Sequence, residues 1–234
     1  MSLITTGDFK TSKGDKRNYL TGIVYMAPSN IVIGINVCKF ASAGCKKACL
    51  YTAGHGAFSN VQAARIKRTE LFRDDINEFM DTITMEIIKL NKKATRKGTS
   101  LAIRLNGTSD ICWEKIRSRL TNKNIFETFP TIQFYDYTKD HTRLDALKGK
   151  WGNYHLTYSV SETKASEKHA LRLLPLGVNC AVVFKELPTK YLGHKVINGD
   201  LDDLRFLDDK GVVVGLKAKG QARKDQSGFV KVAV

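Results

Sequence analysis

Residues 60–106 read NVQAARIKRTELFRDDINEFMDTITMEIIKLNKKATRKGTSLAIRLN and combine the two patterns from which we predict the fold class. From residue 60 to residue 90, apolar side chains recur at three- and four-residue spacing, which predicts one long amphipathic helix. Gly98 ends this helix, and the apolar run at residues 100–105 is typical of a strand. A helix that leads directly into a strand is the repeating unit of an α/β fold.

The same alternation of strands and helices continues on both sides of this unit. We expect strands at residues 21–26, 31–37, 131–137, 154–160, 180–185, 195–197 and 212–217, and helices at residues 113–120, 140–147 and 164–174. Strands separated by helices imply right-handed crossovers and a mostly parallel sheet. About six such units favour a partial (βα)6-type barrel, with an open doubly wound α/β sheet as the alternative. Because short acidic loops join the last strands, we expect an antiparallel C-terminal edge.

The composition favours one folded unit outside the membrane. The chain has 234 residues, 42% of them hydrophobic, with only 4 prolines and no repetitive or linker-like stretch. We therefore expect a single α/β domain over residues 1–234. No apolar run approaches the roughly 18 residues that span a bilayer, so we expect no membrane partner. Residues 1–19 lack the apolar centre of a secretion signal, so the predicted location is the cytoplasm.

The charge of the chain points to an anionic partner. The formal net charge is +15, from 38 Lys and Arg residues against 23 Asp and Glu residues. Such an excess attracts polyanions, so we expect the partner to be nucleic acid or an anionic small molecule. The sequence has no helix-turn-helix or zinc-finger pattern and no glycine-rich phosphate loop.

Three cysteines form the motif with the clearest chemistry. Residues 38–49, CKFASAGCKKAC, hold Cys38, Cys45 and Cys49, three of the five cysteines. In a reducing cytoplasm such cysteines are typical metal ligands, and the neighbouring lysines favour the thiolate that binds metal. Three thiolates without a Cys-x-x-Cys pair favour a [4Fe-4S] cluster with one open iron. Zinc, completed by His55, is the alternative metal.

The expected metal-binding loop covers residues 38–56 and ends with Gly54, His55 and Gly56. The two glycines permit a close approach of the backbone to a cluster or to a bound ligand. Two further cysteines lie outside the loop. Cys112 is interpreted as structural or as a fourth ligand, and Cys180 as a buried side chain of its strand.

Polar residues gather where the predicted parallel strands end, which is where the binding sites of α/β proteins lie. The candidates for cofactor or substrate binding are Arg104, Asn106, Gly107, Thr108, Asp110, Ser159, Ser161, Lys185, Asp200 and Lys217. Arg104 is expected to face inward, where Asp110 or Asp200 would neutralise it. Asp110 and Glu114 are one helical turn apart, so they would act as acid and base or cap a helix. The acidic stretch at residues 200–209 is interpreted as a salt-bridged loop.

The order of strand, three-cysteine loop, helix and strand with a polar glycine motif resembles the start of a radical S-adenosylmethionine enzyme. The cysteines of that family are more closely spaced than those of this chain. There, three cysteines hold a [4Fe-4S] cluster whose open iron binds S-adenosylmethionine. The resemblance implies that residues 106–108 contact the amino group of this cofactor, and that Ser159, Ser161 and Lys185 contact its carboxylate and ribose.

A second resemblance extends over nearly the whole chain. It is carried by Cys38, Cys45, Cys49-Leu50-Tyr51, Gly54, Gly56, Arg65, Arg68, Ser109-Asp110, Trp113-Glu114, residues 215–220 and Gly228-Phe229. In these motifs the chain is similar to a phage family named after gene product eighty-eight of a mycobacteriophage. The resemblance implies a phage-encoded cluster protein of barrel type in the host cytoplasm, without a settled reaction.

Together, the motifs and the resemblances predict an iron–sulfur protein, namely a radical-SAM-like or redox enzyme that acts on an anionic substrate. The alternative is a non-catalytic module, stapled by a cluster or by zinc, whose basic face binds nucleic acid or a host protein. A zinc-dependent hydrolase ranks last, because it would need His55, a carboxylate and an open water position.

Overall fold

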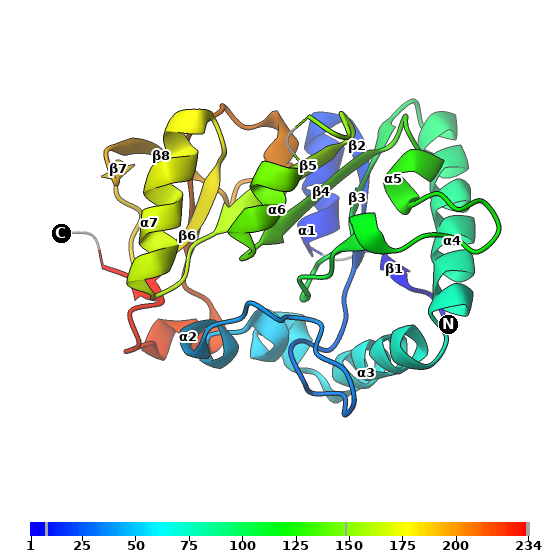
Figure 1. The fold of residues 1–234 in the computed structure, drawn as a ribbon, viewed down its shortest axis with the longest axis horizontal. Coiled ribbons are helices and arrows are strands. Elements are labelled where there is room, and N and C mark those ends of the chain that lie inside the picture. The colour runs from blue at the N-terminus through cyan, green and yellow to red at the C-terminus, as the bar shows by residue number, and fades with distance from the viewer. Residues whose placement is uncertain (8, 148, 233–234) are drawn as a thin grey trace.

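The computed structural model describes residues 1–7, 9–147 and 149–232 and has an α/β fold around a mostly parallel sheet (Figure 1). In their order across the sheet, the strands are β1 (Ile4–Thr5), β2 (Tyr19–Val24), β3 (Ser100–Arg104), β4 (Gln133–Thr138), β5 (Tyr154–Ser159), β6 (Cys180–Phe184), β9 (Val213–Lys217), β8 (His194–Asn198) and β7 (Lys190–Tyr191), and β10 (Val230–Lys231) also pairs with β6. All pairings from β2 to β6, and on through β9 to β8, are parallel. The predicted α/β class and the mostly parallel sheet are therefore confirmed.

The order of the strands follows the chain from β1 to β6 without a reversal. A doubly wound sheet instead reverses its order near the middle, whereas here the order reverses only at β9, β8 and β7. The predicted antiparallel C-terminal edge is right only for β7, because β8 pairs in parallel with β9. At the other end of the sheet, β1 pairs antiparallel with β2.

Helices of very different length connect the strands. The α-helices are α1 (Phe9–Ser12), α2 (Ala43–Lys47), α3 (Ser59–Asp74), α4 (Ile76–Arg96), α5 (Ile125–Thr128), α6 (His141–Ala146) and α7 (Lys164–Leu173), and the 3-10 helices are η1 (Gly14–Arg17), η2 (Leu50–Thr52), η3 (Gly54–Ala57), η4 (Trp113–Lys115), η5 (Leu174–Leu176), η6 (Arg205–Leu207) and η7 (Gly220–Lys224). Figure 1 shows α2 and α3 along the lower edge of the molecule, below the strands. Among the described residues, no helix is both long and apolar enough to cross a membrane.

The predicted long helix is two helices, because the chain breaks at Asp75. This residue has a φ of −143°, and its side chain accepts a hydrogen bond from the backbone N–H of Glu78 at 2.9 Å. An aspartate favours such a capping position over a helix interior. The apolar face of α4 buries Phe79, Ile83 and Ile87 in the same core cluster as residues of β2 and β3.

Two other predicted elements are wrong over most of their length. Residues 31–37 form a loop, because Gly34 turns the chain with a φ of +86°. Of the predicted helix at residues 113–120, only η4 forms. The indole Nε1 of buried Trp113 donates to Asn106 Oδ1 at 3.1 Å and ties this segment to the end of β3.

The two faces of the sheet are covered differently. One apolar cluster joins α4 to β2, β3 and β4, and a second joins α7 to β5, β6 and β9. On the opposite face, Ala102 and Tyr135 pack against Leu204, just before η6. The acidic residues around Leu204 form ion pairs with Arg104, Arg205 and Lys219, which confirms the interpretation of residues 200–209 as a salt-bridged loop.

Candidate functional site

The cysteine loop, residues 38–56, lies across the carboxyl ends of the parallel strands. The Sγ of Cys38 lies 3.6 Å from the carbonyl oxygen of Thr108, which follows β3. On the far side, Glu162, which follows β5, accepts a hydrogen bond from Ser42 Oγ at 2.6 Å and one from the Gly44 N–H at 2.8 Å. The loop is therefore held at the ends of two strands, at the edge where α/β proteins place their sites.

Close packing fixes the position of α2, the short helix that carries Cys45. Ser42 caps this helix, because its Oγ accepts a hydrogen bond from the Cys45 N–H at 3.2 Å. A side chain at Gly44 would place its Cβ 2.5 Å from Ser227 Oγ and 2.8 Å from both Glu162 Oε2 and Phe229 Cβ. Only glycine allows α2 to approach the C-terminal segment this closely.

The three thiols of the loop are close enough to influence one another. Burial is the main cause that raises the pKa of Cys38 to about 12, and the charges of Cys49 and Cys45 raise it further. Burial also raises the pKa of Cys45 and of Cys49, and the charge of Cys45 adds to the shift of Cys49. Lys46 lowers the pKa of Cys45, as expected of a basic neighbour, but burial outweighs its effect and the net shift is upward.

Two cations lie beside the thiols, and neither was a predicted site residue. Lys139 follows β4, and its Nζ donates to Ser159 Oγ at 2.8 Å and lies 5.2 Å from the ring of Phe229. Its charge lowers the pKa of Cys45 and Cys49, and the charge of Arg65 lowers that of Cys49. Lys139 follows a predicted strand, so the rule that selected the other strand-end residues would also have found it.

Asp110 and Glu114 are both partners of Arg143. The guanidinium of Arg143 donates from Nε and Nη2 to the two oxygens of Glu114 at 2.9 and 2.8 Å, and from Nη1 to Asp110 Oδ1 at 3.0 Å. Asp110 Oδ2 also accepts the Lys139 N–H at 2.8 Å. The side chains of Asp110 and Glu114 therefore serve a buried ion-pair network, and neither caps a helix in the structure.

Most polar side-chain groups of the turn at residues 106–108 form hydrogen bonds within the protein. Asn106 Oδ1 accepts hydrogen bonds from Ser109 Oγ at 2.8 Å and from the Ile111 N–H at 2.9 Å, besides the one from Trp113. The Oγ1 of Thr108 donates to the Met26 carbonyl at 2.6 Å. Gly107 packs so closely that a Cβ there would lie 2.7 Å from the Val24 carbonyl oxygen. These contacts shape the turn that receives Cys38.

Arg104 is buried as expected, but its partner is neither Asp110 nor Asp200. Its Nη1 donates to Asp203 Oδ2 at 3.0 Å, and its guanidinium lies 4.5 Å from the ring centroid of Tyr137. Asp200 instead accepts the Lys217 N–H at 3.0 Å and pairs with Lys219 Nζ at 2.5 Å. The sequence correctly predicted a carboxylate as the partner of Arg104, but the predicted residue was wrong. Three carboxylates lie at positions 200–203, and the sequence does not distinguish between them.

The remaining predicted residues divide between the interior and the surface. Ser161 is buried, and its Oγ lies 3.3 Å from Thr163 Oγ1 at the start of α7. Ser159 holds Lys139, whereas the side chains of Lys185 and Lys217 are exposed. Among these residues, Ser159 is connected to the thiols through Lys139, whose charge acts on Cys45 and Cys49.

The end of the cysteine loop combines buried and exposed residues. Gly54 has a φ of +53°, as its glycine allows, and Gly56 is buried, whereas His55 is exposed and stacks on Phe58 with ring centroids 5.5 Å apart. Cys112 has Arg143 and Glu114 among its charged neighbours, and Cys180 is fully buried in β6, as predicted. In the described ranges, no group of three or more His, Cys, Asp or Glu residues is arranged to hold a single metal ion.

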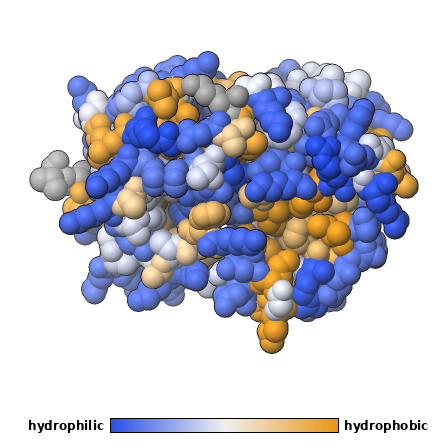
Figure 2. Space-filling model, in the orientation of Figure 1, coloured by the Kyte–Doolittle hydropathy of each residue, from blue (hydrophilic) through white to orange (hydrophobic). Residues whose placement is uncertain are grey.

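Apolar side chains are unusually exposed around the cysteine loop. Ile33 is 88% exposed, Phe40 51% and Phe58 57%, and Ile31 and Leu50 are also exposed. Figure 2 shows an apolar patch that reaches the lower edge of the molecule, the edge along which α2 and α3 lie in Figure 1. Large exposed apolar side chains that gather in one region mark an interaction surface more often than isolated ones do.

A comparison with known families matches residues 2–233 to the family described as Gene product 88. The chain belongs to the Gene product 88 family. This confirms the resemblance to gene product eighty-eight that its motifs indicated. No curated protein and no solved structure matches the chain.

The Gene product 88 match includes two distant motifs that meet in space. Ala48 of the cysteine loop packs in one apolar cluster with Ala222 and Phe229. Nearby, a Cβ at Gly220 would lie 2.7 Å from the Cβ of Ala53. The C-terminal motif of this Gene product 88 protein therefore forms one wall of the region around the thiols.

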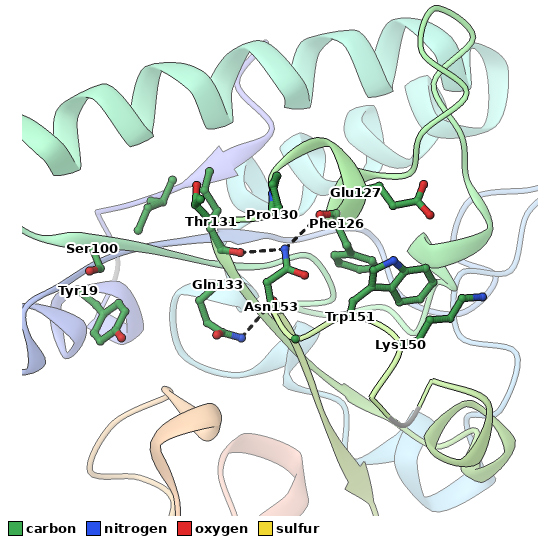
Figure 3. A pocket seen from close by; sticks show the side chains of 13 residues that line it. Tyr19, Ser100, Phe126, Glu127, Pro130, Thr131, Gln133, Lys150, Trp151 and Asn153 are labelled. Atoms are coloured by element: carbon green, nitrogen blue, oxygen red, sulfur yellow. Dashed lines mark hydrogen bonds between the residues drawn. The ribbon is translucent and has the colours of Figure 1, made fainter.

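A pocket of about 540 Å³ lies at the other edge of the sheet, among residues that begin strands of this Gene product 88 protein (Figure 3). Tyr19, Ser100 and Gln133 line it from the amino ends of β2, β3 and β4. Trp151 and Asn153 complete it from the segment before β5. None of the predicted site residues lies in this pocket.

Proposed function

We propose that Cys38, Cys45 and Cys49 bind a [4Fe-4S] cluster in a phage-encoded enzyme that carries out radical-SAM-like or redox chemistry on an anionic substrate. The observation that carries the proposal is the position of the three thiols. They come from one loop, influence one another's pKa, and lie at the carboxyl edge of a parallel sheet. Sites of parallel α/β proteins occur at this edge.

The number of thiols favours a cluster over zinc. The three thiols of the loop are neighbours in the structure. A structural zinc site needs about four protein ligands, whereas a cluster accepts three cysteines.

The charges beside the thiols suit a negatively charged group. Three deprotonated thiolates need compensation in a partly buried site, and Lys139 and Arg65 lie where they lower the pKa of Cys49. The ammonium of Lys139 is held in place by Ser159, and the loop itself by Glu162. The cluster would supply one-electron chemistry and, at its open iron, a position for a small ligand such as S-adenosylmethionine.

The proposal includes a partial (βα)6-type barrel. The order of the strands from β2 to β6 supports it, because neighbouring strands of such a barrel also follow the order of the chain. The carboxyl ends of these strands would then surround the cysteine loop, with Lys139 and Ser159 facing it.

Anaerobic reconstitution with iron and sulfide tests the cluster. We expect a brown protein with about four irons and four sulfides per chain, since the bound group is a [4Fe-4S] cluster. Cys45→Ala should lose the colour and the iron, whereas Cys112→Ala, the matched control, should keep both. One tight zinc and no iron in the wild-type protein would contradict the proposal.

Paramagnetic resonance of the reduced protein then tests the cofactor. A change in the cluster signal on addition of S-adenosylmethionine supports radical-SAM-like chemistry. An unchanged signal, with reversible reduction of the cluster, leaves the redox enzyme as the proposal.

The alternative function is a non-catalytic module that is stapled by a cluster or by zinc and binds nucleic acid or a host protein. The exposed apolar residues around the cysteine loop favour it. An intact cluster that is neither reducible nor sensitive to S-adenosylmethionine would favour the module over the enzyme.

A further inference from the structure

A groove of about 520 Å³ separates the cysteine loop from the C-terminal segment. It is lined by Lys47 and Ala48 on one side and by residues of η7 and the following turn on the other, among them Gln221, Lys224 and Gln226. Except for Ala48, the residues that line it are polar or charged. Such a groove offers ammonium and amide donors to a ligand rich in acceptors.

The one acidic residue in the groove is already engaged. Asp225 accepts hydrogen bonds from Ser227 Oγ at 2.6 Å and from the Val230 N–H at 3.0 Å. These bonds contribute to a lowered pKa of its carboxyl and tie it to its own turn. Asp225 remains ionised, but Lys47 and Lys224 outnumber it, so the groove presents a net positive charge to a ligand.

Further cations surround the groove. Lys46 and Arg223 adjoin the lysines of the groove in the chain, and all four side chains are exposed. Across the described part of the chain, none of the four belongs to an ion pair. Since their charges are not compensated by carboxylates of the protein, they are available to a polyanion.

Exposed aromatic rings accompany these charges. Phe40 and Phe58 lie in the segment around the cysteine loop and are 51% and 57% exposed. Surfaces that bind single strands combine rings on which bases stack with cations that contact the phosphates, and Phe40 belongs to the same loop as Lys47. Duplex DNA fits less well, since α2 has only five residues and is too short to enter a major groove as a recognition helix.

We propose that the groove between α2 and η7 binds single-stranded nucleic acid, with its phosphates on Lys47 and Lys224. Ala48 lines the groove and directly precedes Cys49, so the bound strand passes beside the thiols. The bound nucleic acid would be the substrate of the enzyme only if the function proposed above holds. Its binding in the groove does not depend on that function.

Fluorescence anisotropy with a labelled single-stranded deoxythymidine oligonucleotide tests the proposal. Lys47→Glu combined with Lys224→Glu should weaken binding about tenfold or more and reduce the salt slope by about one unit or more, because two phosphate contacts are lost. The matched control is Lys89→Glu with Lys92→Glu, two exposed residues of α4 at the opposite end of Figure 1. It changes the net charge equally and should weaken binding less than about threefold.

Three outcomes would overturn the proposal. The first is that both double variants weaken oligonucleotide binding equally. The second is that the protein binds duplex DNA as tightly as the single strand. The third is that it binds anionic lipid vesicles but not the oligonucleotide. If the double charge reversal unfolds the protein, Lys47→Gln with Lys224→Gln replaces it and should still reduce the salt slope.

The metal-free wild-type protein separates the two proposals. It should bind the oligonucleotide with measurable affinity and with the same loss in the Lys47→Glu, Lys224→Glu variant, because the lysines of the groove do not depend on iron. Equal affinity of the metal-free wild-type protein and this double variant would count against the groove. The iron content of the wild-type protein alone tests the cluster.

Discussion

The two edges of the sheet differ in what they offer a ligand. The amino edge has the pocket of about 540 Å³. The side-chain amide of Asn153 in this pocket already donates hydrogen bonds to the carbonyls of Phe129 and Phe126, at 2.9 and 3.2 Å, and so has little left to offer a ligand. The carboxyl edge brings together three thiols, Lys139 and an ion-paired Arg143. In this fold, the 540 Å³ pocket and the reactive side chains therefore lie at opposite edges of the sheet, so pocket size does not indicate where the chemistry occurs.

The largest expected effect comes from the network that supports the carboxyl edge. Arg143→Met should lower the free energy of unfolding by about 3–5 kcal/mol, because it leaves the buried carboxylates of Glu114 and Asp110 without their cation. Arg172→Met is the matched control on an exposed pair with Asp145 and should cost about 0–1 kcal/mol. Chemical denaturation measures both, and similar losses would refute the structural role of the network.

The pH dependence of stability should report on Asp136, a buried residue of β4. Burial raises its pKa from 3.8 to about 7, although it accepts hydrogen bonds from the Asn106 N–H at 2.6 Å and from Tyr154 Oη at 3.1 Å. Between these pH values the folded protein holds a proton that the unfolded chain has lost. This contribution to stability is therefore complete below about pH 4 and is lost as the pH rises through about 7.

Asp136→Asn removes this titration. Relative to the wild-type protein, the variant should gain stability as the pH rises from about 4 to about 7, by at most about 4 kcal/mol. Denaturation at a series of pH values measures the difference. A constant difference between the two proteins would show that Asp136 titrates normally.

Substitution of one glycine at each edge of the sheet should have a smaller effect on stability and should again differ between the two edges. Gly44→Ala should cost about 1–3 kcal/mol, because the new Cβ would overlap Ser227, Glu162 and Phe229. It should also reduce the iron retained after reconstitution. Gly152→Ala, in the amino-edge pocket, meets nothing within 4 Å and should leave the melting temperature and the iron content unchanged. Equal effects of the two substitutions would break the comparison.

The smallest effect is expected from the amino-edge pocket itself. Trp151→Ala removes an aromatic ring that packs 5.6 Å from that of Phe126. It should change neither the iron content nor the affinity for the oligonucleotide, because the pocket lies at the amino edge of the sheet and the thiols lie at the carboxyl edge. A tenfold loss of affinity would move the binding site to the amino edge.

Periodicity predicted the fold well where a segment is buried on one face. The strands at residues 154–160, 180–185 and 212–217 appear within one residue of their predicted ends. It failed at Asp75, where one capping contact outweighs the apolar pattern, and at residues 31–37, where Gly34 turns an apolar run into a loop.

The candidate site was predictable in its location but not in its pairings. Spacing alone indicated that Cys38, Cys45 and Cys49 act together. No pattern shows that Arg104 meets Asp203 or that Arg143 meets Glu114, because these partners lie 99 and 29 positions apart and meet only through the sheet. Lys139 was missed although it follows a predicted strand, since its role depends on contacts with Ser159 and Phe229.

The packing of α2 against Glu162, Ser227 and Phe229 has a consequence for how the protein matures during synthesis. Cys45 leaves the ribosome long before these three residues do, so the nascent chain presents its sulfur atoms without the walls that later enclose them. If the proposed cluster binds there, its assembly would therefore follow translation, and the sulfur atoms are most accessible to oxidants before that point.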